Sequence, residues 1–370
     1  MSDARPILLA AGGTGGHLFP AAALAAALRA RGAEVELATD DRALKYDQNF
    51  PARAIHGFPA ATTTSAGVLS KASAVITLGS GVVAALMKLG RIRPRAVVGF
   101  GGYPTVPPLV AASILHVPTI LHEQNAVMGR ANKFLSSRVT LIATGFPNLK
   151  GAGAETRAKI RHTGNPVRPT VLAAAATPYA ALEGAPLKLL VTGGSQGARV
   201  MSDIVPAALA LLRAEERDRI QLTQQARGED KARVSAACAQ MNLSAEIAEF
   251  FPDLPQRMAD AHLVIGRAGA STVSELAVVG RPAVLVPFPY ALDQDQAANA
   301  ATLAEAGAAI VLPQIEFTPE RLAGILSGMI AVPAKLADMA KAAKAVGIPD
   351  AADRLAELVL GVARPANERR

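Results

Sequence analysis

Short apolar runs that end in glycines, each followed by a longer helical run, recur along the chain. Residues 7–11 predict a strand, and the glycine-rich loop after them leads into a helix that stops near residue 32. Residues 187–192 begin a second unit of the same design. Apolar strands that alternate with helices are typical of parallel sheets covered on both faces. The pattern therefore predicts an α/β protein.

A second pair of units shares the order of strand, loop, helix and strand. One starts at residue 96, has a Gly-Gly-Tyr loop and ends with a strand at His122. The other starts at residue 262 and has a helix over about 272–280 and a strand that ends near Pro287. Two halves built alike predict two doubly wound domains that face each other across a cleft.

The stretch Gly164–Pro169 predicts the domain boundary, because it ends the first set of units before an Ala-rich stretch leads into the second. We expect an N-terminal domain over residues 1–168 and a C-terminal domain over 169–345. Residues 346–370 predict a closing helix and a basic tail.

Composition narrows the class of protein. The chain has 370 residues, of which 51% are hydrophobic and 18% charged, so it can form sizeable cores and is not a disordered chain. Cys238 is the single cysteine, which excludes an intramolecular disulfide framework and a cysteine-based zinc site. A reducing cytoplasm is therefore the expected compartment.

Positive charge gathers in the first half of the chain. The whole chain has a formal net charge of +8, but residues 1–168 carry +11 and the remainder −3. No acidic residue lies between Asp47 and Glu123. This half is expected to face something anionic. A membrane surface or a phosphate-bearing lipid fits better than nucleic acid, because interleaved aromatic residues for base stacking are scarce.

Two apolar stretches bear on membrane contact. Residues 96–115 carry no charge, but their glycines and prolines predict a strand, a tight loop and a helix rather than a membrane-spanning helix. Residues 75–89 place apolar side chains along one helical face, with Ile76, Val83 and Met87 beside it and basic residues around it. This stretch predicts either a buried core helix or a basic-rimmed apolar patch for peripheral membrane contact.

The first glycine loop, residues 12–17, predicts a binding site at a helix N-terminus, where glycines let a ligand approach the backbone and the helix end attracts an anion. Leu18 stands where a dinucleotide fingerprint needs a small residue, and no Gly-Lys-Ser/Thr follows as in a P-loop. The alternative is a tight turn with an incidental histidine. The ionisable His17 at the end of the loop favours a site.

The second glycine loop, residues 193–197, matches the Gly-x-Ser-x-Gly pattern of serine hydrolases around Ser195. Such a hydrolase needs an acid and then a histidine downstream, and the only later histidine, His262, comes just before a strand. A serine and backbone amides at a helix N-terminus more readily hold a phosphate.

Three further stretches carry polar groups at the ends of elements. Residues 267–272 form a third small-residue loop before a helix, in which Glu275 could bind ribose hydroxyls or simply lie in a capped first turn. Asp293 and Asp295 form a D-x-D pair, which holds Mn or Mg in some nucleotide-sugar enzymes but more often lies in a solvated loop. Residues 122–125 end a strand, where ligands bind in open α/β sheets, and they lack the second histidine of a zinc motif.

The ordered motifs together resemble the MurG family of bacterial glycosyltransferases, which move N-acetylglucosamine (GlcNAc) from UDP-GlcNAc to lipid I and so make lipid II for peptidoglycan. The motifs GGTGGH, GGY, HEQN, GNPVR, GGSQGA and RAGASTVSE occur in the expected order over nearly the whole chain. The resemblance implies a GT-B fold of two Rossmann-like domains. It also implies that the C-terminal domain binds the donor, and that the N-terminal domain binds the acceptor and the cytoplasmic face of the plasma membrane.

The resemblance implies roles for single residues as well. Those near the diphosphate and the transferred sugar are Thr14, Gly15 and Gly16. Asn125 would lie in the cleft, Arg168 and Ser195 near the phosphates, Phe251 beside uracil, Glu275 at the ribose and Gln296 at the GlcNAc hydroxyls. The family often has Asp-Asp-His-Gln where this chain has Asp293-Gln294-Asp295-Gln296, so no role follows for Gln294 and Asp295.

The transfer reaction requires a base, and the sequence offers candidates for it. An acceptor sugar hydroxyl must attack the anomeric carbon while UDP leaves, and His17 is the candidate to take its proton, with Glu123 as a competitor. Helix N-termini and Arg168 rather than a metal would stabilise the departing diphosphate, so no cofactor is expected. A single displacement would invert the α-linked donor to a β-linked product.

Other activities stay open at this point. Another GT-B enzyme, such as a glycosyltransferase with a different lipid acceptor or a UDP-GlcNAc epimerase, would keep the donor site and change the acceptor side. An esterase would use Ser195 as its nucleophile. A non-catalytic nucleotide-binding module would tolerate the loss of His17. The expected partners are UDP-GlcNAc, lipid I, an anionic membrane surface and other cell-wall synthesis proteins, but no nucleic acid.

Overall fold

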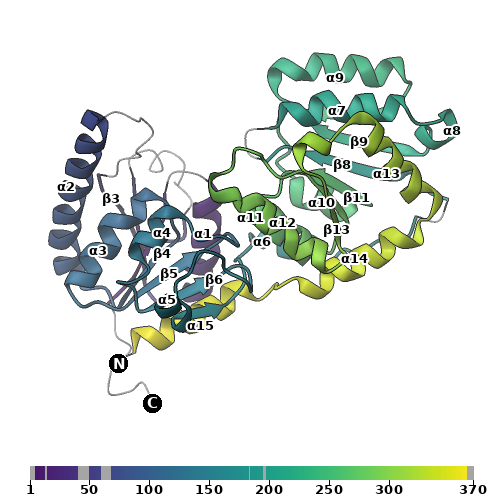
Figure 1. Cartoon of the computed structure of the whole chain (residues 1–370). Helices are drawn as coiled ribbons and strands as arrows, with labels where there is room; N and C mark the ends of the chain where they lie inside the picture. The colour runs from purple at the N-terminus through teal and green to yellow at the C-terminus, as the bar shows by residue number, and fades with distance from the viewer. Residues whose placement is uncertain are drawn as a thin grey trace. The chain divides into compact units, whose positions relative to one another are not determined.

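The computed structural model describes residues 5–12, 15–40, 50–59, 68–182, 184–194 and 197–364. The chain forms two compact units, each with its own parallel sheet (Figure 1). The N-terminal unit comprises Met1–Arg168 and Pro349–Arg370, and the C-terminal unit comprises Pro169–Ile348. The predicted pair of parallel-sheet α/β domains is confirmed.

The sheet of the N-terminal unit has the strand order β3-β2-β1-β4-β5-β6-β7, and every pair is parallel. Its strands are β1 (Ile7–Ala10), β2 (Val35–Thr39), β3 (Ala54–Gly57), β4 (Ala96–Gly99), β5 (Thr119–Glu123), β6 (Leu141–Thr144) and β7 (Ile160–His162). Every residue of β1, β2, β4 and β5 is buried. This burial explains why these strands are mostly apolar rather than alternating in sequence.

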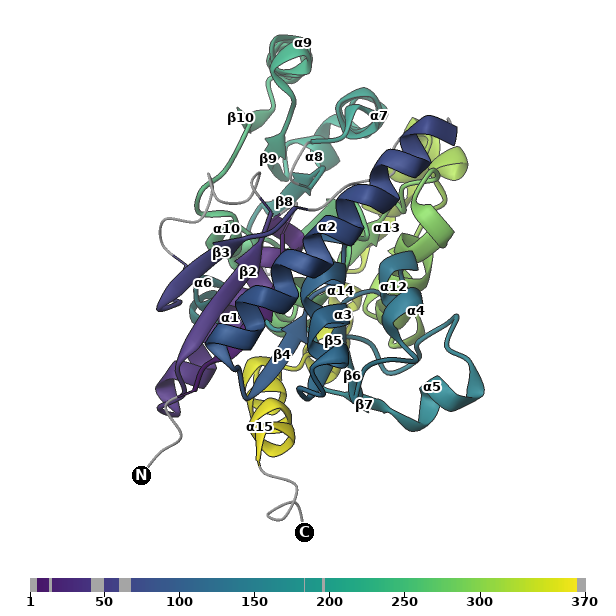
Figure 2. The same cartoon turned by 90° about the vertical axis from the view of Figure 1, so that its left-hand side faces the viewer.

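Helices cover this sheet. They are α1 (Gly15–Ala30), α2 (Val68–Ile92), the 3-10 turn η2 (Tyr103–Thr105), α3 (Val106–Ile114), α4 (Arg130–Leu135), α5 (Ala154–Ala158) and α15 (Ala351–Ala363). The long helix α2 runs beside α3 (Figure 2), whereas α15 returns from the end of the chain to pack on α1. The strand, loop and helix predicted within residues 96–115 are confirmed as β4, η2 and α3.

The C-terminal unit repeats the design with the strand order β10-β9-β8-β11-β12-β13, again all parallel. Its strands are β8 (Leu187–Thr192), β9 (Ile220–Gln225), β10 (Ser244–Ala248), β11 (Leu263–Gly266), β12 (Ala283–Leu285) and β13 (Ala309–Val311). The helix expected over about 272–280 is α11, which starts two residues earlier, at Ala270, and ends at Val279.

The other helical segments of this unit flank the sheet or connect its strands. They are α6 (Pro169–Ala174), α7 (Arg199–Ala210), α8 (Ala214–Arg217), α9 (Gly228–Gln240), α10 (Leu254–Asp260), η3 (Leu292–Gln294), α12 (Asp295–Glu305), η4 (Gln314–Glu316), α13 (Pro319–Ala331) and α14 (Ala334–Val346).

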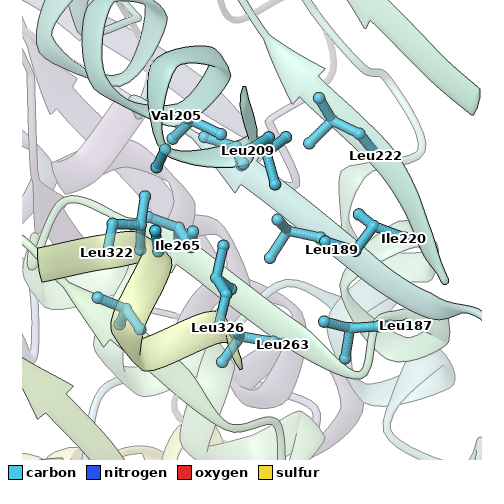
Figure 3. Packing of buried hydrophobic residues seen from close by; sticks show 14 of the residues in the cluster. Leu187, Leu189, Val205, Leu209, Ile220, Leu222, Leu263, Ile265, Leu322 and Leu326 are labelled. Atoms are coloured by element: carbon cyan, nitrogen blue, oxygen red, sulfur yellow. The ribbon is translucent and has the colours of Figure 1, made fainter. Parts of the chain in front are cut away.

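The core of the C-terminal unit lies between the sheet and helices α7 and α13. Leu189 on β8 and Ile265 on β11 belong to one buried cluster with Leu209 on α7 and Leu326 on α13 (Figure 3). Burying one such side chain contributes roughly 1.5–3 kcal/mol. These contacts hold the strands of the sheet rigidly, and the loops at their ends are positioned by them.

In each sheet the strand order reverses beside the first strand, so that later strands are added on its other side. β1 lies between β2 and β4, and β8 lies between β9 and β11. The carboxyl ends of these strands are in register, at Ala10 with Gly99 in one sheet and at Thr192 with Gly266 in the other. In open α/β sheets, ligands bind outside the carboxyl ends of the strands at this reversal. Both predicted glycine loops begin there.

A membrane crossing requires a long apolar helix. Within the described ranges, no single helix has the length and apolar content to span a membrane, and only α13 taken together with the helices after it, across a 99° bend, meets that test.

Candidate active site at the carboxyl ends of the two sheets

His17 lies in the first turn of α1, directly after the loop that follows β1. Its Nδ1 is 2.8 Å from the carbonyl oxygen of Phe100, just beyond β4. The side-chain nitrogen of Gln124, just beyond β5, is 2.9 Å from the same Nδ1. Burial lowers the pKa of His17 below its ordinary value, and the hydrogen bond to Phe100 offsets part of that effect. A neutral imidazole of this kind can accept a proton near physiological pH.

The opposite nitrogen of His17, Nε2, faces a glycine. A side-chain Cβ built on Gly102 would lie 3.6 Å from Nε2, and the φ angle of Gly102 is +74°, which disfavours any other residue. The Gly-Gly-Tyr motif singled out in the sequence therefore borders His17 and leaves Nε2 uncovered on this side.

Glu123, the competing candidate base, holds the loop after β5 in place. Its Oε1 accepts the backbone N–H of Asn125 at 3.0 Å. Its Oε2 accepts the backbone N–H of Gly129 at 2.9 Å and the side-chain amide of Asn132 at 2.7 Å. The carboxylate is buried among these donors. Glu123 thus positions Asn125, a predicted cleft residue, and its oxygens are engaged by the loop itself.

His122 is buried in β5 beside the ring of Phe100, whose centroid lies 5.4 Å away. Its Nε2 lies 3.2 Å from the carbonyl oxygen of Gly164. Desolvation lowers its pKa to about 4, so the ring is neutral at physiological pH. This residue forms part of the core under the site.

The predicted phosphate ligand Arg168 reaches the same helix end as His17. Its guanidinium lies over the ring of Phe19, 5.0 Å from the centroid, and Phe19 is in the second turn of α1. Gly15 and Gly16 open α1, and its first turn contains no acidic residue. An unopposed helix N-terminus next to an arginine favours an anion. Thr14 lies outside the described residues.

The glycine loop of the C-terminal unit is fixed by a glutamine from the neighbouring strand. Oε1 of Gln225, at the end of β9, accepts the hydroxyl of Thr192 at 3.0 Å and the backbone N–H of Gly193 at 3.1 Å. A Cβ on Gly193 would lie 2.1 Å from the backbone nitrogen of Ala198, so only glycine fits. Ser195 lies outside the described residues, and its predicted phosphate contact stays a prediction.

Gln296, at the start of α12, joins two loops of the predicted donor site. Its Oε1 accepts the backbone N–H of Ala268 at 3.3 Å and that of Phe288 at 2.9 Å. Glu275 is buried in α11, the helix that the first of these loops opens. Arg267 is bound to the carbonyls of Val286 and Pro287, and burial lowers its pKa.

Two adjacent phenylalanines after β10 differ in how far their rings are exposed. The ring of Phe251, predicted to lie beside uracil, is only 5% exposed and is covered by the guanidinium of Arg257 at 4.4 Å. The ring of Phe250 is 70% exposed. An exposed ring is the one that a base can stack on, so Phe250 is a candidate that sequence reasoning missed. The predicted contact of Phe251 with uracil stays a prediction.

The D-x-D stretch has unusual backbone geometry. Asp293 and Gln294 both adopt left-handed conformations, with φ of 58° and 54°. Asp295 accepts the backbone N–H of Gln296 at 2.7 Å, and desolvation raises the pKa of its carboxyl. No group of three or more metal-ligating side chains occurs in the part of the chain that the structure describes.

Helix α2 has a buried face and an exposed apolar face within residues 75–89, and peripheral membrane contact through the exposed face stays a prediction. Ala85 and Leu89 are buried in the core of the N-terminal unit. Ile76, Val83 and Met87 are 72%, 55% and 62% exposed. Lys88, Arg91 and Arg93 are exposed at the carboxyl end of the same helix. We call the set Ile76, Val83 and Met87 the apolar face of α2.

Two family models cover most of the chain. Residues 7–144 match the glycosyltransferase family 28 N-terminal domain, and residues 188–355 match the glycosyltransferase family 28 C-terminal domain. The first match covers β1 to β6, and the second covers nearly all of β8 and the strands of its sheet from β9 to β13.

Relatives match over the full length of the chain. A protein of Methylobacterium nodulans named UDP-N-acetylglucosamine--N-acetylmuramyl-(pentapeptide) pyrophosphoryl-undecaprenol N-acetylglucosamine transferase is 59% identical over 374 residues, which cover 100% of both chains. A protein of the same name from Mesorhizobium japonicum is 56% identical over 96% of this chain and 95% of its own.

Solved structures share the fold. The crystal structure of Acinetobacter baumannii MurG matches with a TM-score of 0.77 and 30% identity, over 96% of this chain and 99% of that one. UDP-GlcNAc 2-epimerase from Neisseria meningitidis matches with a TM-score of 0.66 over 96% of this chain and 99% of that one. At 13% identity, this second likeness shows the fold alone.

Proposed function

Because the chain belongs to glycosyltransferase family 28, we propose that it transfers GlcNAc from UDP-GlcNAc to lipid I, the undecaprenyl-pyrophosphoryl-MurNAc-pentapeptide, and so forms lipid II. The names of its full-length relatives support this donor and acceptor. The observation that carries the catalytic part is His17, a neutral imidazole with Nδ1 against a carbonyl and Nε2 beside Gly102.

The reaction is a single displacement at the anomeric carbon. Nε2 of His17 takes the proton of the C4 hydroxyl of MurNAc as its oxygen forms a bond to the anomeric carbon of GlcNAc. The bond from that carbon to the diphosphate oxygen breaks, and UDP leaves with the electron pair. Attack opposite the leaving group inverts the α-linked donor to a β-linked product.

Positive potential from the protein stabilises the departing diphosphate. Thr14, the N-terminus of α1 at Gly15 and Gly16, and the guanidinium of Arg168 supply part of it. Ser195 and the backbone of the second glycine loop supply the rest. Preorganised donors of this type need no reorganisation at the moment of reaction.

The C-terminal unit binds the donor through residues at the ends of its strands. Glu275 binds the ribose, Gln296 binds the GlcNAc hydroxyls, and the segment at Phe251 contacts uracil. Asn125, held by Glu123, contributes from the N-terminal unit. Burial of Glu275 and the double backbone contact of Gln296 support these roles, because groups held by the fold bind ligands without losing much conformational entropy.

The N-terminal unit binds the anionic cytoplasmic surface of the plasma membrane peripherally. The apolar face of α2, with exposed Lys88, Arg91 and Arg93 beside it, is the surface that does so. An apolar face buries in the acyl boundary while basic residues are attracted to anionic lipids. This placement brings the acceptor, whose prenyl chain stays in the bilayer, to the unit that carries His17.

A transfer assay with radiolabelled UDP-GlcNAc and a lipid I analogue tests the proposal. His17→Ala should lower turnover by about 10²–10⁴-fold while donor binding stays near wild type. His116→Asn is the matched control, because His116 is exposed and its left-handed backbone tolerates asparagine. Full turnover in His17→Ala would remove His17 as the base. If the protein epimerises UDP-GlcNAc and transfers no GlcNAc to the lipid I analogue, the epimerase alternative is correct and the proposed function is wrong.

A further inference from the structure

Nδ1 of His17 lies in a triangle of three polar atoms. Phe100 O is 2.8 Å from Nδ1, Gln124 Nε2 is 2.9 Å from Nδ1, and Gln124 Nε2 is 3.0 Å from Phe100 O. A carbonyl oxygen can only accept, and an amide nitrogen can only donate. The ring nitrogen therefore faces two neighbours with opposite demands, and the position of its proton decides which one is satisfied.

Counting hydrogen bonds separates the two neutral forms of His17. With the proton on Nδ1, Phe100 O accepts from both His17 and Gln124, because a carbonyl oxygen has two lone pairs. With the proton on Nε2, one N–H of the Gln124 amide donates to Nδ1, and the Phe100 carbonyl loses the donor of the ring. The second N–H of the amide cannot replace it well, because the three atoms form a nearly equilateral triangle and the two N–H bonds of an amide diverge far more widely than the directions to Nδ1 and Phe100 O. The first form therefore has the better-aligned hydrogen bonds. An amide turned the other way would bring its oxygen 3.0 Å from the Phe100 oxygen, where two acceptors repel.

The backbone of Gln124 is fixed, which restricts where its side chain can lie. The backbone carbonyl oxygen of Gln124 accepts a hydrogen bond from the side-chain amide of Asn165 at 2.9 Å, and Gln124 is buried. The Phe100 peptide is fixed in turn, because its N–H donates to Ala10 O at the end of β1. The triangle is thus built at the carboxyl ends of β1, β4 and β5, three neighbouring buried strands of the N-terminal sheet.

We propose that Gln124 is a positioning residue for His17: its amide N–H, which donates to the Phe100 carbonyl and faces Nδ1, keeps the imidazole neutral, while the Phe100 carbonyl holds the proton on Nδ1 so that the free nitrogen is Nε2. Phe100 sets the tautomer. Gln124 disfavours the imidazolium, because its N–H dipole faces a ring that would gain a full positive charge. This inference rests on the proposed role of His17 as the base and names the group that prepares it.

Among the described residues, few charged groups lie on the elements around this ring. His122 on β5 interacts electrostatically with His17, but with a pKa of about 4 it is neutral while His17 titrates. Asp40, after β2, lies near Gly12 in the loop that leads to α1. Arg168 lies over Phe19 on α1, and Tyr103 in η2 follows Gly102. Variants at position 124 leave all four in place, so their effects can be compared directly.

The test is imidazole ¹⁵N NMR on the ligand-free, full-length protein, with His17→Gln to assign the signals. Wild type should show a neutral His17 with Nδ1 protonated and Nε2 bare. Gln124→Met removes the N–H donor, so the titration midpoint of His17 should rise. Gln124→Glu places a carboxylate against the Nδ1 proton, so the midpoint should rise further, by about one pH unit or more. Gln221→Met, an exposed glutamine of the other unit, should change nothing.

The acidic limb of the pH–rate profile should move with the NMR midpoint in both variants, whereas a merely structural role would lower turnover at every pH without moving the limb. A wild-type ring protonated on Nε2, or a midpoint unmoved in both variants, would overturn the inference. Because NMR needs no turnover, the two proposals fail differently. Shifted midpoints together with an active His17→Ala enzyme would contradict the role of His17 as the base but would still support the effect of Gln124 on the His17 ring.

Discussion

The side-chain oxygen of Gln296 accepts the backbone N–H of Phe288 at 2.9 Å, which joins the loop after β12 to the first turn of α12. Ala268 N–H donates to the same oxygen at 3.3 Å. Two N–H donors on one atom identify that atom as the oxygen of the amide. The NH₂ group of Gln296 makes no hydrogen bond among the described residues, so it is the part of the side chain available to a sugar hydroxyl.

This orientation makes Gln296→Glu a selective variant. A glutamate can still accept from Phe288 and Ala268 but cannot donate to the sugar. The affinity for UDP-GlcNAc should fall by roughly 10-fold, about the value of one hydrogen bond, while the affinity for UDP stays unchanged. Calorimetry with both ligands measures this difference. An equal loss for UDP would place Gln296 away from the transferred sugar.

The fold could be predicted because its signal is local and repeated. Residues 7–11 and 187–192 are apolar strands followed by glycines, and such a pattern needs no knowledge of distant contacts. The details of the site depend on contacts that sequence spacing does not encode. His17 and Gln124 are 107 positions apart. Phe250 and Phe251 are adjacent residues of the same type, so the sequence does not show which ring is exposed. Only the packing of Phe251 under Arg257 makes one ring buried and leaves the other exposed.

Arg281 is a buried cation that sequence reasoning did not single out, and it supports the C-terminal unit. Its guanidinium donates to carbonyls of Ala259, Val279, Gly280, Thr177 and Pro178. Arg281→Met would leave these acceptors without their donor, so the free energy of unfolding should fall by about 3 kcal/mol or more. Urea unfolding measures it, with the exposed Arg321→Met as control. A wild-type midpoint for Arg281→Met would contradict this account.

Glu123→Gln separates a structural carboxylate from a catalytic one. The new amide NH₂ must face either the N–H of Asn125 or the donors of Gly129 and Asn132, so one hydrogen bond is replaced by a clash of donors. Stability should fall by about 1–3 kcal/mol, and turnover should fall at every pH without moving the acidic limb. Turnover as a function of pH, compared with His17→Ala, decides. Loss of the limb in Glu123→Gln would make Glu123 the base.

Val83→Asp tests the apolar face of α2. Val83 is 55% exposed, so the substitution should not disturb the core, but it puts a negative charge where the apolar face would enter an anionic surface. Sedimentation with anionic vesicles should show weaker binding than for wild type. Wild-type binding itself should weaken as salt rises, since screening acts over roughly 10 Å at 0.1 M. Ser137→Asp, at an exposed position of the same unit outside α2, gives the matched control for added charge alone. Binding indifferent to Val83→Asp would place the contact elsewhere.

His122 predicts how stability depends on pH. In the folded protein desolvation lowers its pKa from 6.5 to about 4, whereas the unfolded chain keeps the ordinary value. Between these two values the unfolded state binds more protons than the native state. The stability that a neutral His122 contributes is therefore fully present above about pH 6.5 and is lost as pH falls towards 4.

The loss should approach about 3 kcal/mol at the acid end, because a tenfold change in proton affinity corresponds to roughly 1.4 kcal/mol. Other buried histidines add to the slope, so the informative quantity is the difference between wild type and His122→Gln, which can still donate to Gly164 O but does not titrate. Urea unfolding at a series of pH values from 7 to 4 should show a shallower decline in the variant. Parallel curves would mean that His122 takes up its proton in the folded state as readily as in the unfolded chain.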